Sequence, residues 1–236
     1  SAATQSAGCW PAPERTNQSA CLAELVIRHC TLVPGWGLEC DCGPKRPAEP
    51  SLELVQLQAA VRIEHSILGS IVVQENEVLR DPLPLCISDS VVDATERFKQ
   101  AIGGIGSRSA FVTLTILRST VFGYTQVHAV KLAQDTIFTD CLHVNRRQLG
   151  CVRFCYVKPG CRTPRRYHCQ PDLVFAALED GNNQSGSEGS NEEARAARER
   201  AAREREAARL EPQFTSERYG NPGYAQLGQH CADELK

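Results

Sequence analysis

Five cysteines gather late in the sequence, with two histidines nearby. They are Cys141, Cys151, Cys155, Cys161 and Cys169, and the histidines are His143 and His168. Zinc and iron–sulfur sites usually draw on pairs of cysteines two residues apart, whereas three, five and seven residues separate the last four cysteines here. We therefore expect disulfides or buried thiols at these positions, with a metal centre as the alternative. The spacing alone does not identify the pairing.

A second candidate for chemistry is a run of positive charge in the same region. Between Cys141 and Pro171 the sequence contains no acidic residue. The basic residues there are Arg146, Arg147, Arg153, Lys158, Arg162, Arg165 and Arg166. This local excess predicts binding of an acidic surface, a phosphate or a nucleic acid. Alternatively, these arginines cap the end of the fold, because arginines commonly donate hydrogen bonds to the exposed carbonyls of terminal loops, as at the end of a solenoid.

Carboxylates are available for acid–base or calcium chemistry, but their pattern does not favour an enzyme. The candidates are Asp89, Asp93, Asp135 and Asp140. They fall at different positions of a nine-residue sequence repeat, described below, or on either side of Arg118. A polysaccharide lyase or hydrolase would need clustered carboxylates. Aromatic residues, on which sugars stack, make up only 6% of the chain. His65 with Asp89 suggests a general base, or alternatively two corner side chains that satisfy a turn. We assign no catalytic residue and no cofactor.

A nine-residue phrase that recurs along the chain would position these groups. Its copies are Leu25–Val33, Val61–Gly69, Leu85–Asp93, Leu114–Phe122 and, more loosely, Val130–Phe138, with a shorter copy at Val152–Val157. The first position is always aliphatic, and the third holds Ile27, Ile63, Ile87, Ile116 and Leu132. The positions between them are mostly polar, which is the alternation of a strand with one buried face.

Later positions of the phrase indicate a corner and then a second strand. The fifth position holds His29, His65, Asp89, Arg118 and Gln134, which stacked coils would align as a polar ladder. The sixth holds Cys30, Ser66, Ser90, Ser119 and Asp135, all small and able to hydrogen-bond, as a corner requires. The eighth is aliphatic again, with Leu32, Leu68, Val92, Val121 and Ile137.

The recurrence predicts an all-β fold, a right-handed parallel β-helix (solenoid) with irregular loops over residues 23–157. Third-position residues lie 36, 24, 29 and 16 positions apart, against roughly twenty residues for one coil, so the longer intervals contain loops. The alternative is an antiparallel sandwich, which also alternates. A sandwich gives no reason for the same phrase to recur with its columns intact.

Changes in composition divide the chain outside residues 23–157 into five segments. Residues 1–22 form an N-terminal loop segment, 158–180 a basic exit segment, and 181–191 a flexible linker rich in Gly, Ser and Asn. Residues 192–210 are almost only Ala, Arg and Glu, which predicts a charged, solvated helix without a large apolar stripe. Residues 211–236 carry Tyr219 and Tyr224 among turn residues, and we expect this tail to dock on the same chain or on a neighbouring copy.

Net charge, hydropathy and cysteine content limit the classes of partner and the location expected for the chain. A net charge of −2 gives no global reason for a nucleic-acid or membrane partner, so nucleic acid is not expected. No stretch approaches the roughly 18 consecutive apolar residues of a membrane span. Twelve cysteines, an even number, favour an oxidising environment and an extracellular or particle-associated location. With no methionine in it, the chain is interpreted as a fragment or a processed product.

Three stretches carry a resemblance to a known family. They are Gly150–Val157, Arg162–Pro171 and Pro212–Leu227. With the repeated phrases, they resemble right-handed parallel β-helix proteins of the pectate-lyase-like kind. Within that group they resemble an uncharacterised bacterial family that is sometimes encoded near phage-tail-like, contractile-injection genes. The resemblance implies a β-helix within a larger bacterial protein or particle, and it brings no catalytic residues.

Together these observations favour a non-catalytic structural, assembly or binding module whose partners are other protein subunits or its own copies, in a closed oligomer or a filament. A carbohydrate-binding or carbohydrate-active protein is the first alternative, and a Cys-rich metal-binding module is the second. The candidate binding residues are Arg146, Arg147, Arg153, Arg162, Arg165, Arg166, Tyr219 and Tyr224.

Overall fold

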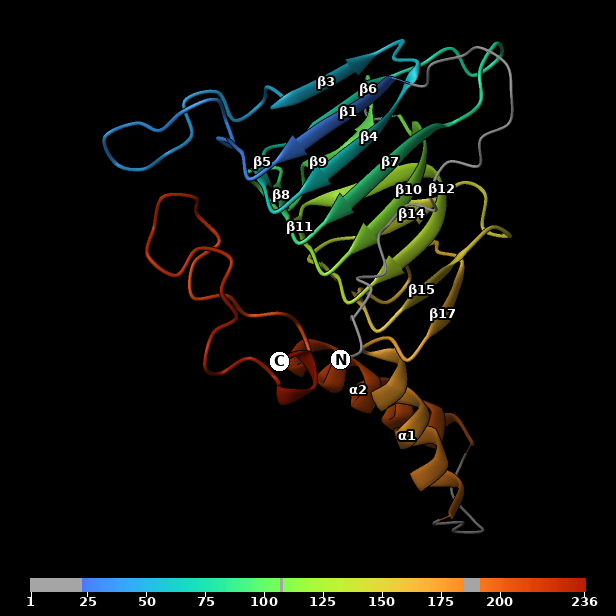
Figure 1. Ribbon diagram of the computed structural model, residues 1–236. Helices are drawn as coiled ribbons and strands as arrows, with labels where there is room; N and C mark the ends of the chain where they lie inside the picture. The colour runs from blue at the N-terminus through green and yellow to red at the C-terminus, as the bar shows by residue number, and fades with distance from the viewer. Residues whose placement is uncertain (1–22, 107, 185–191) are drawn as a thin grey trace, which may run out of the picture.

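The structure, a computed structural model, describes residues 23–106, 108–184 and 192–236. Parallel strands stack in coils, and two helices lie at one end (Figure 1). Each complete coil follows three parallel faces, which are called here the first, second and third sheets, although one long strand joins the first and third into a continuous 11-stranded sheet and the second has six strands. The architecture is consistent with a parallel β-solenoid. The segments 1–22 and 185–191, which include most of the expected linker, lie outside the described residues.

The three sheets are defined by their strands. The first contains β1 (Ala23–Arg28), β4 (Ala59–Glu64), β7 (Leu83–Ser88), β10 (Ala110–Leu117), the later part of β12 (Tyr124–Gln134), β15 (Cys151–Arg153) and β17 (Arg165–Tyr167). The second contains β2 (Thr31–Leu32), β5 (Ile67–Leu68), β8 (Val91–Asp93), β11 (Thr120–Phe122), β13 (Ile137–Phe138) and β16 (Tyr156–Val157). The third contains β3 (Leu52–Val55), β6 (Ile71–Gln74), β9 (Gln100–Gly104), the start of β12 and β14 (Leu142–Val144).

The aliphatic columns predicted from the phrase line the core. In successive coils Leu25 aligns with Val61, Val61 with Leu85, and Leu85 with Leu114. The isoleucines of the third position align in the same way, and those on β4, β7 and β10 are fully buried. Because side chains alternate across a strand, the first and third positions face the same interior. The sandwich alternative is excluded by the parallel pairing of all these strands.

The fifth copy of the phrase differs from its predicted alignment by one residue. Leu114 aligns with Val130, but Thr115 aligns with Leu132, so β12 contains a β-bulge at Lys131. Gly150 lies against this bulge with φ of +75°, and a Cβ there would approach Val130 O to 2.0 Å. The bulge moves every later column by one position. The residues that complete the third, fifth, sixth and eighth columns are therefore Ala133, Asp135, Thr136 and Phe138, not Leu132, Gln134, Asp135 and Ile137.

The sixth column forms a hydrogen-bonded ladder at the corner between the first and second sheets. Ser66 N donates to Ser90 Oγ (3.1 Å), and Ser90 N donates to Ser119 Oγ (3.2 Å). Each hydroxyl in turn donates to the carbonyl two residues before it, as Ser90 Oγ does to Ser88 O (2.6 Å). Cys30, Cys155 and Cys169 occupy the same column and direct their thiols to the equivalent carbonyls. The small polar residues of the phrase therefore satisfy the buried backbone of each corner.

Stacking continues past Val157, where the β-helix was predicted to end. β17 pairs with β15, and Gln170 forms a parallel bridge with Tyr156. The segment predicted as an irregular exit therefore contains a strand and the start of α1 (Asp172–Gln184), which also enters the predicted linker. α2 spans Glu192–Arg209, and a 3₁₀-helix spans Asp233–Leu235. None of the helices in the described residues has the length and apolarity needed to cross a membrane.

Candidate functional site

The fifth-position residues form the polar ladder expected at the corner, and each adopts a left-handed backbone conformation. The φ values of His29, His65, Asp89, Arg118 and Asp135 lie between 45° and 52°. Such values are uncommon for residues other than glycine, so the tight corner imposes them. This column is therefore shaped by the turn, which is the structural alternative considered for it.

His65 and Asp89, which lie in this column, are not paired as a general base would require. Asp89 accepts two hydrogen bonds from Arg118 (2.6 and 2.7 Å), and these bonds lower the pKa of its carboxyl. His65 instead stacks on His29, with ring centroids 5.0 Å apart. A carboxylate held by a guanidinium orients no imidazole for proton transfer.

The other carboxylates proposed for chemistry have separate partners. Asp93 is buried and accepts hydrogen bonds from Tyr224 Oη (2.7 Å) and Thr95 N (2.7 Å). Burial raises the pKa of the Asp93 carboxyl. Asp140 lies 3.9 Å from Lys158 Nζ, and Asp135 accepts a hydrogen bond from the neighbouring glutamine. In the part of the chain that the structure describes, each of these carboxylates contacts a different partner, and they are not arranged as an acid–base pair.

The late cysteines divide between a disulfide and single thiols. Cys141 and Cys161 form a disulfide, one of the two arrangements expected for this cluster. Cys155 and Cys169 are buried thiols of the corner ladder, and burial raises the pKa of Cys155 to about 12. Cys151 lies on β15 and is partly exposed. Among the described residues no group of three or more His, Cys, Asp or Glu side chains is arranged to hold a metal ion.

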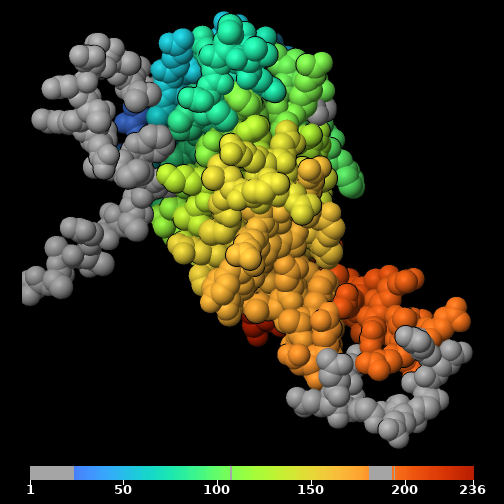
Figure 2. Space-filling view, turned by 90° about the vertical axis from the view of Figure 1, so that its right-hand side faces the viewer, coloured from blue at the N-terminus to red at the C-terminus, as the bar shows by residue number. Residues whose placement is uncertain are grey.

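The basic residues predicted to bind a partner lie in the last coils, where Figure 2 shows the yellow and orange part of the surface. Arg146 and Arg147 follow β14, Arg162 follows the disulfide, and Arg153 and Arg165 lie on β15 and β17. All five are exposed. Arg166 behaves differently. It donates to Cys161 O (3.1 Å) and pairs with Asp172 (3.3 Å), so it fastens the last coil to the first turn of α1, as the capping alternative predicts.

Tyr219 and Tyr224 make contacts within their own chain. They belong to the tail of residues 211–236, which docks on the outside of the second sheet. The Tyr224 ring lies 6.1 Å from that of Phe122 and 5.4 Å from that of Tyr219, and Phe214 packs edge-on against Phe122 at 4.8 Å. The hydroxyl of Tyr224 reaches the buried Asp93. The tail therefore covers the middle coils of the second sheet.

Ion pairs at two further points hold the tail in place. Arg97 pairs with Glu217 and with Glu211, the latter at 3.0 Å. Arg218 donates to Cys42 O (2.8 Å) and pairs with Asp41 (3.3 Å), both in the loop between β2 and β3 of the first coil. In Figure 1 the tail, in red, runs along the side of the stack toward this loop, in blue.

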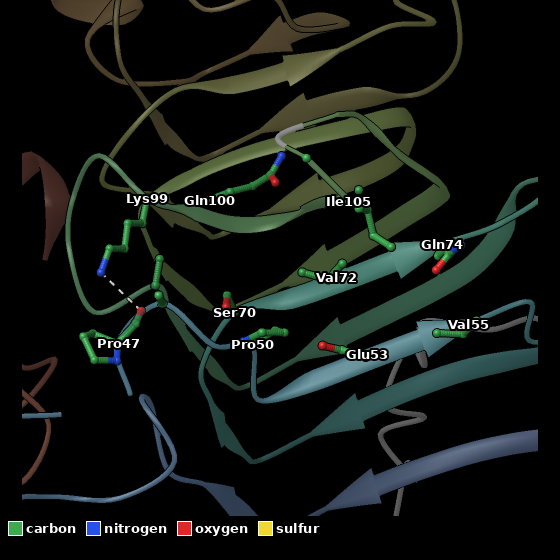
Figure 3. Close-up of a pocket in the computed structure, with 14 residues that line it drawn as sticks. Pro47, Pro50, Glu53, Val55, Ser70, Val72, Gln74, Lys99, Gln100 and Ile105 are labelled. Atoms are coloured by element: carbon green, nitrogen blue, oxygen red, sulfur yellow. Dashed lines mark hydrogen bonds between the residues drawn. The ribbon is translucent and has the colours of Figure 1, made fainter. Parts of the chain in front are cut away.

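A lateral groove of about 460 Å³ lies on the outer face of the third sheet (Figure 3). Its floor consists of outward side chains of β3 and β6, among them Glu53, Val72 and Gln74. The loop at 47–50 and Ile105 contribute to its lining. The sheet beneath is rigid because its backbone groups are paired in the parallel ladder.

Hydrogen bonds preform the walls of this groove. Lys99 Nζ donates to Pro47 O (3.2 Å) and pairs with Glu96 (2.8 Å), so the proline-rich loop is tied to the start of β9. Gln100 Nε2 donates to Arg108 O (2.9 Å) and ties β9 to the chain beyond its end. The groove is therefore part of the folded architecture, and a ligand would meet it already shaped.

A second hollow of about 480 Å³ adjoins the groove and shares with it Gln74, Gly104, Ile105 and Gly106. It is also lined by Glu75, Ser109 and Phe111. Within the described part of the chain, Glu75 Oε1 and Ser109 Oγ are buried without a hydrogen-bond partner. Unmet hydrogen-bonding capacity beside a hollow favours a polar occupant.

The groove was not predicted from the sequence, because its lining comes from the intervals between copies of the phrase, where β3, β6 and β9 lie and where only loops were expected. The prolines at 44–50 and the glycines at 103–106 lie in the intervals for which only loops were expected. Comparison of the chain with protein-family models, with curated proteins and with solved structures found no match.

Proposed function

We propose that this chain is a non-catalytic structural and assembly module built on a right-handed parallel β-helix. The handedness is supported by the strong general preference of parallel strand connections for the right-handed sense. The non-catalytic character is supported by the separate partners of Asp89, Asp93 and Asp140. The bacterial β-helix family that the sequence resembles, sometimes encoded near phage-tail-like genes, agrees with a role inside a larger particle.

The observation that carries the proposal is the open edge of the first coil. In the described part of the chain, β1 pairs only with β4, β2 only with β5 and β3 only with β6. Leu25 and Val26 on β1 are 36% and 45% exposed, and Val55 at the end of β3 is 56% exposed. An open strand edge with apolar side chains pairs readily with another strand. The partner that satisfies this edge is a strand of another copy of the chain.

Assembly of copies through this edge can be tested by light scattering coupled to gel filtration over a range of protein concentrations. The chain should increase in mass with concentration, and Leu25→Lys should keep it monomeric, because a charge at the edge opposes strand addition. Leu79→Lys, at a side chain that is 78% exposed in a turn, is the matched control and should behave like the parent. A parent chain that remains monomeric throughout would contradict assembly through copies.

A second candidate function, carbohydrate binding, is favoured by the groove of Figure 3. Amide and carboxylate side chains beside apolar ones on a fixed floor suit the hydroxyls and ring faces of a sugar chain. Titration calorimetry with a panel of neutral oligosaccharides should show binding that Gln74→Ala weakens about tenfold, by the loss of one or two hydrogen bonds. Gln148→Ala, at an exposed turn residue outside the lining of the groove, is the control. Equal affinities of the two variants would argue against the groove.

A further inference from the structure

The outer face of the first sheet changes in its charge balance from the first coils to the last. On β1 and β4 the arginines are matched by carboxylates. Arg28 pairs with Glu64 at 2.7 Å, and Arg62 pairs with Glu24 at 2.9 Å. The charge at this end of the face is therefore internally neutralised.

On β15 and β17 the arginines of the same face have no such match. Arg153 and Arg165 are exposed, and no carboxylate in the described residues lies within 4.0 Å of either guanidinium. Arg153 donates instead to the amide oxygen of Gln134 (2.8 Å). A guanidinium whose only side-chain partner is a neutral amide keeps its full attraction for an anion.

Exposed aromatic rings lie directly beside these arginines. The strand register aligns Arg153 with Tyr167, and the next residues along the two strands are Phe154 and His168. Phe154 is 50% and Tyr167 58% exposed. The Tyr167 ring lies 4.1 Å from that of His168 and 5.8 Å from that of Phe154. We call Arg153, Phe154, Arg165, Tyr167 and His168 the terminal basic face.

The surroundings of the terminal basic face are also mainly basic. Arg146 and Arg147 lie in the turn that leads into β15, and both are exposed. Two carboxylates, Asp135 and Glu234, line a hollow together with Phe154 and His168. Asp135 accepts a hydrogen bond from Gln134 Nε2 (2.8 Å), and Glu234 pairs with Arg209 (2.6 Å). The carboxylate of Asp172 forms an ion pair with Arg166. The face therefore has an excess of positive charge, although the whole chain carries −2.

We propose that the terminal basic face binds single-stranded nucleic acid, with its arginines on phosphates and its rings stacked on bases. Positive charge interleaved with exposed aromatic rings is the combination that holds single strands without reading their sequence. An acidic protein surface would use the arginines but would leave three clustered rings without a role. The proposal stands on the last coils and is independent of the open edge of β1.

Fluorescence anisotropy of a labelled oligothymidylate tests the proposal, with a probe of about 15 nucleotides, at the upper end of single-strand site sizes. If about three phosphates are contacted, raising the salt from roughly 50 to 200 mM should weaken binding about 20-fold. Arg153→Ala combined with Arg165→Ala should reduce that salt effect to about threefold. Tyr167→Ala should weaken binding about tenfold through the lost stacking.

The matched control is Arg28→Ala combined with Arg62→Ala, which removes two arginines from the neutralised end of the same sheet and should leave affinity unchanged. Circular dichroism establishes that each variant is folded. No binding at protein concentrations up to about 100 µM, the weak limit of non-specific affinity, would overturn the proposal. Binding that depends on the arginines but not on Tyr167, and that heparin fragments match, would also overturn it in favour of a general polyanion site.

Discussion

The corner ladder predicts that replacing Ser90 with alanine weakens the fold far more than the loss of one small side chain suggests. Ser90 is 4% exposed. Its hydroxyl accepts a hydrogen bond from Ser66 N (3.1 Å) and donates one to Ser88 O (2.6 Å). The Ser90→Ala variant therefore removes the hydroxyl and leaves the N–H of Ser66 in a buried corner without its partner.

The magnitude follows from these two bonds. A buried donor left without a partner costs about 1–3 kcal/mol, and a net hydrogen bond contributes about 1 kcal/mol. The free energy of unfolding should thus fall by about 2–4 kcal/mol. Ser90→Cys should cost less than about 1 kcal/mol, since a thiol can still donate and accept weakly. The sequence already places cysteines in this column at Cys30, Cys155 and Cys169.

Urea unfolding followed by circular dichroism measures both variants, with the slope of the transition checked for a change in cooperativity. The reasoning would be refuted by a Ser90→Ala variant within about 0.5 kcal/mol of the parent, the usual range of a neutral surface change. It would also be refuted if the cysteine and alanine variants lost equal stability, because the ladder would then not depend on a hydrogen-bonding group.

Three further predictions concern the disulfide, a buried carboxyl and a buried thiol. Cys161→Ser should lower the free energy of unfolding by about 3 kcal/mol, the loop-closure value for its separation of 20 residues, and denaturant titration measures it. Because burial raises the pKa of Asp93 in the folded state, the contribution of this carboxyl to stability is present in full below the ordinary pKa of an aspartate and is lost as the pH rises through the raised value. The Asp93→Asn variant should lack this pH-dependent contribution, which unfolding of both proteins at several pH values measures. Iodoacetamide should label the exposed Cys40 of the native protein well before Cys155, whose pKa of about 12 keeps its thiol protonated, and equal labelling rates by mass spectrometry would contradict this.

The repeated phrase predicted much of the stack of strands that Figure 1 shows. The first and third columns were correct over β1, β4, β7 and β10, because period-two alternation with an aliphatic interior is a local property of each strand. The prediction slipped by one residue in β12, where the bulge at Lys131 is accommodated beside Gly150. No local pattern marks an extra residue whose place depends on the neighbouring coil.

The candidate sites were predictable only in part. The late run of arginines was visible in the sequence, yet its division into Arg166, which fastens α1, and Arg153 and Arg165, which face outward, follows from the strand register. The same holds for the choice of Cys141 with Cys161 among the cysteines, since pairing depends on which loops lie together.

By itself, the sequence determined the stacked corner and its two flanking strands, because burial and hydrogen bonding at each position act through neighbouring residues in the chain. The tertiary structure alone decided the third sheet, the groove on it and the position of the tail. The third sheet and the groove join segments from successive coils, and the tail joins residues more than a hundred positions apart, as in the contact of Tyr224 with Asp93. Such contacts form only after the coils have stacked, so nothing in a local pattern specifies them.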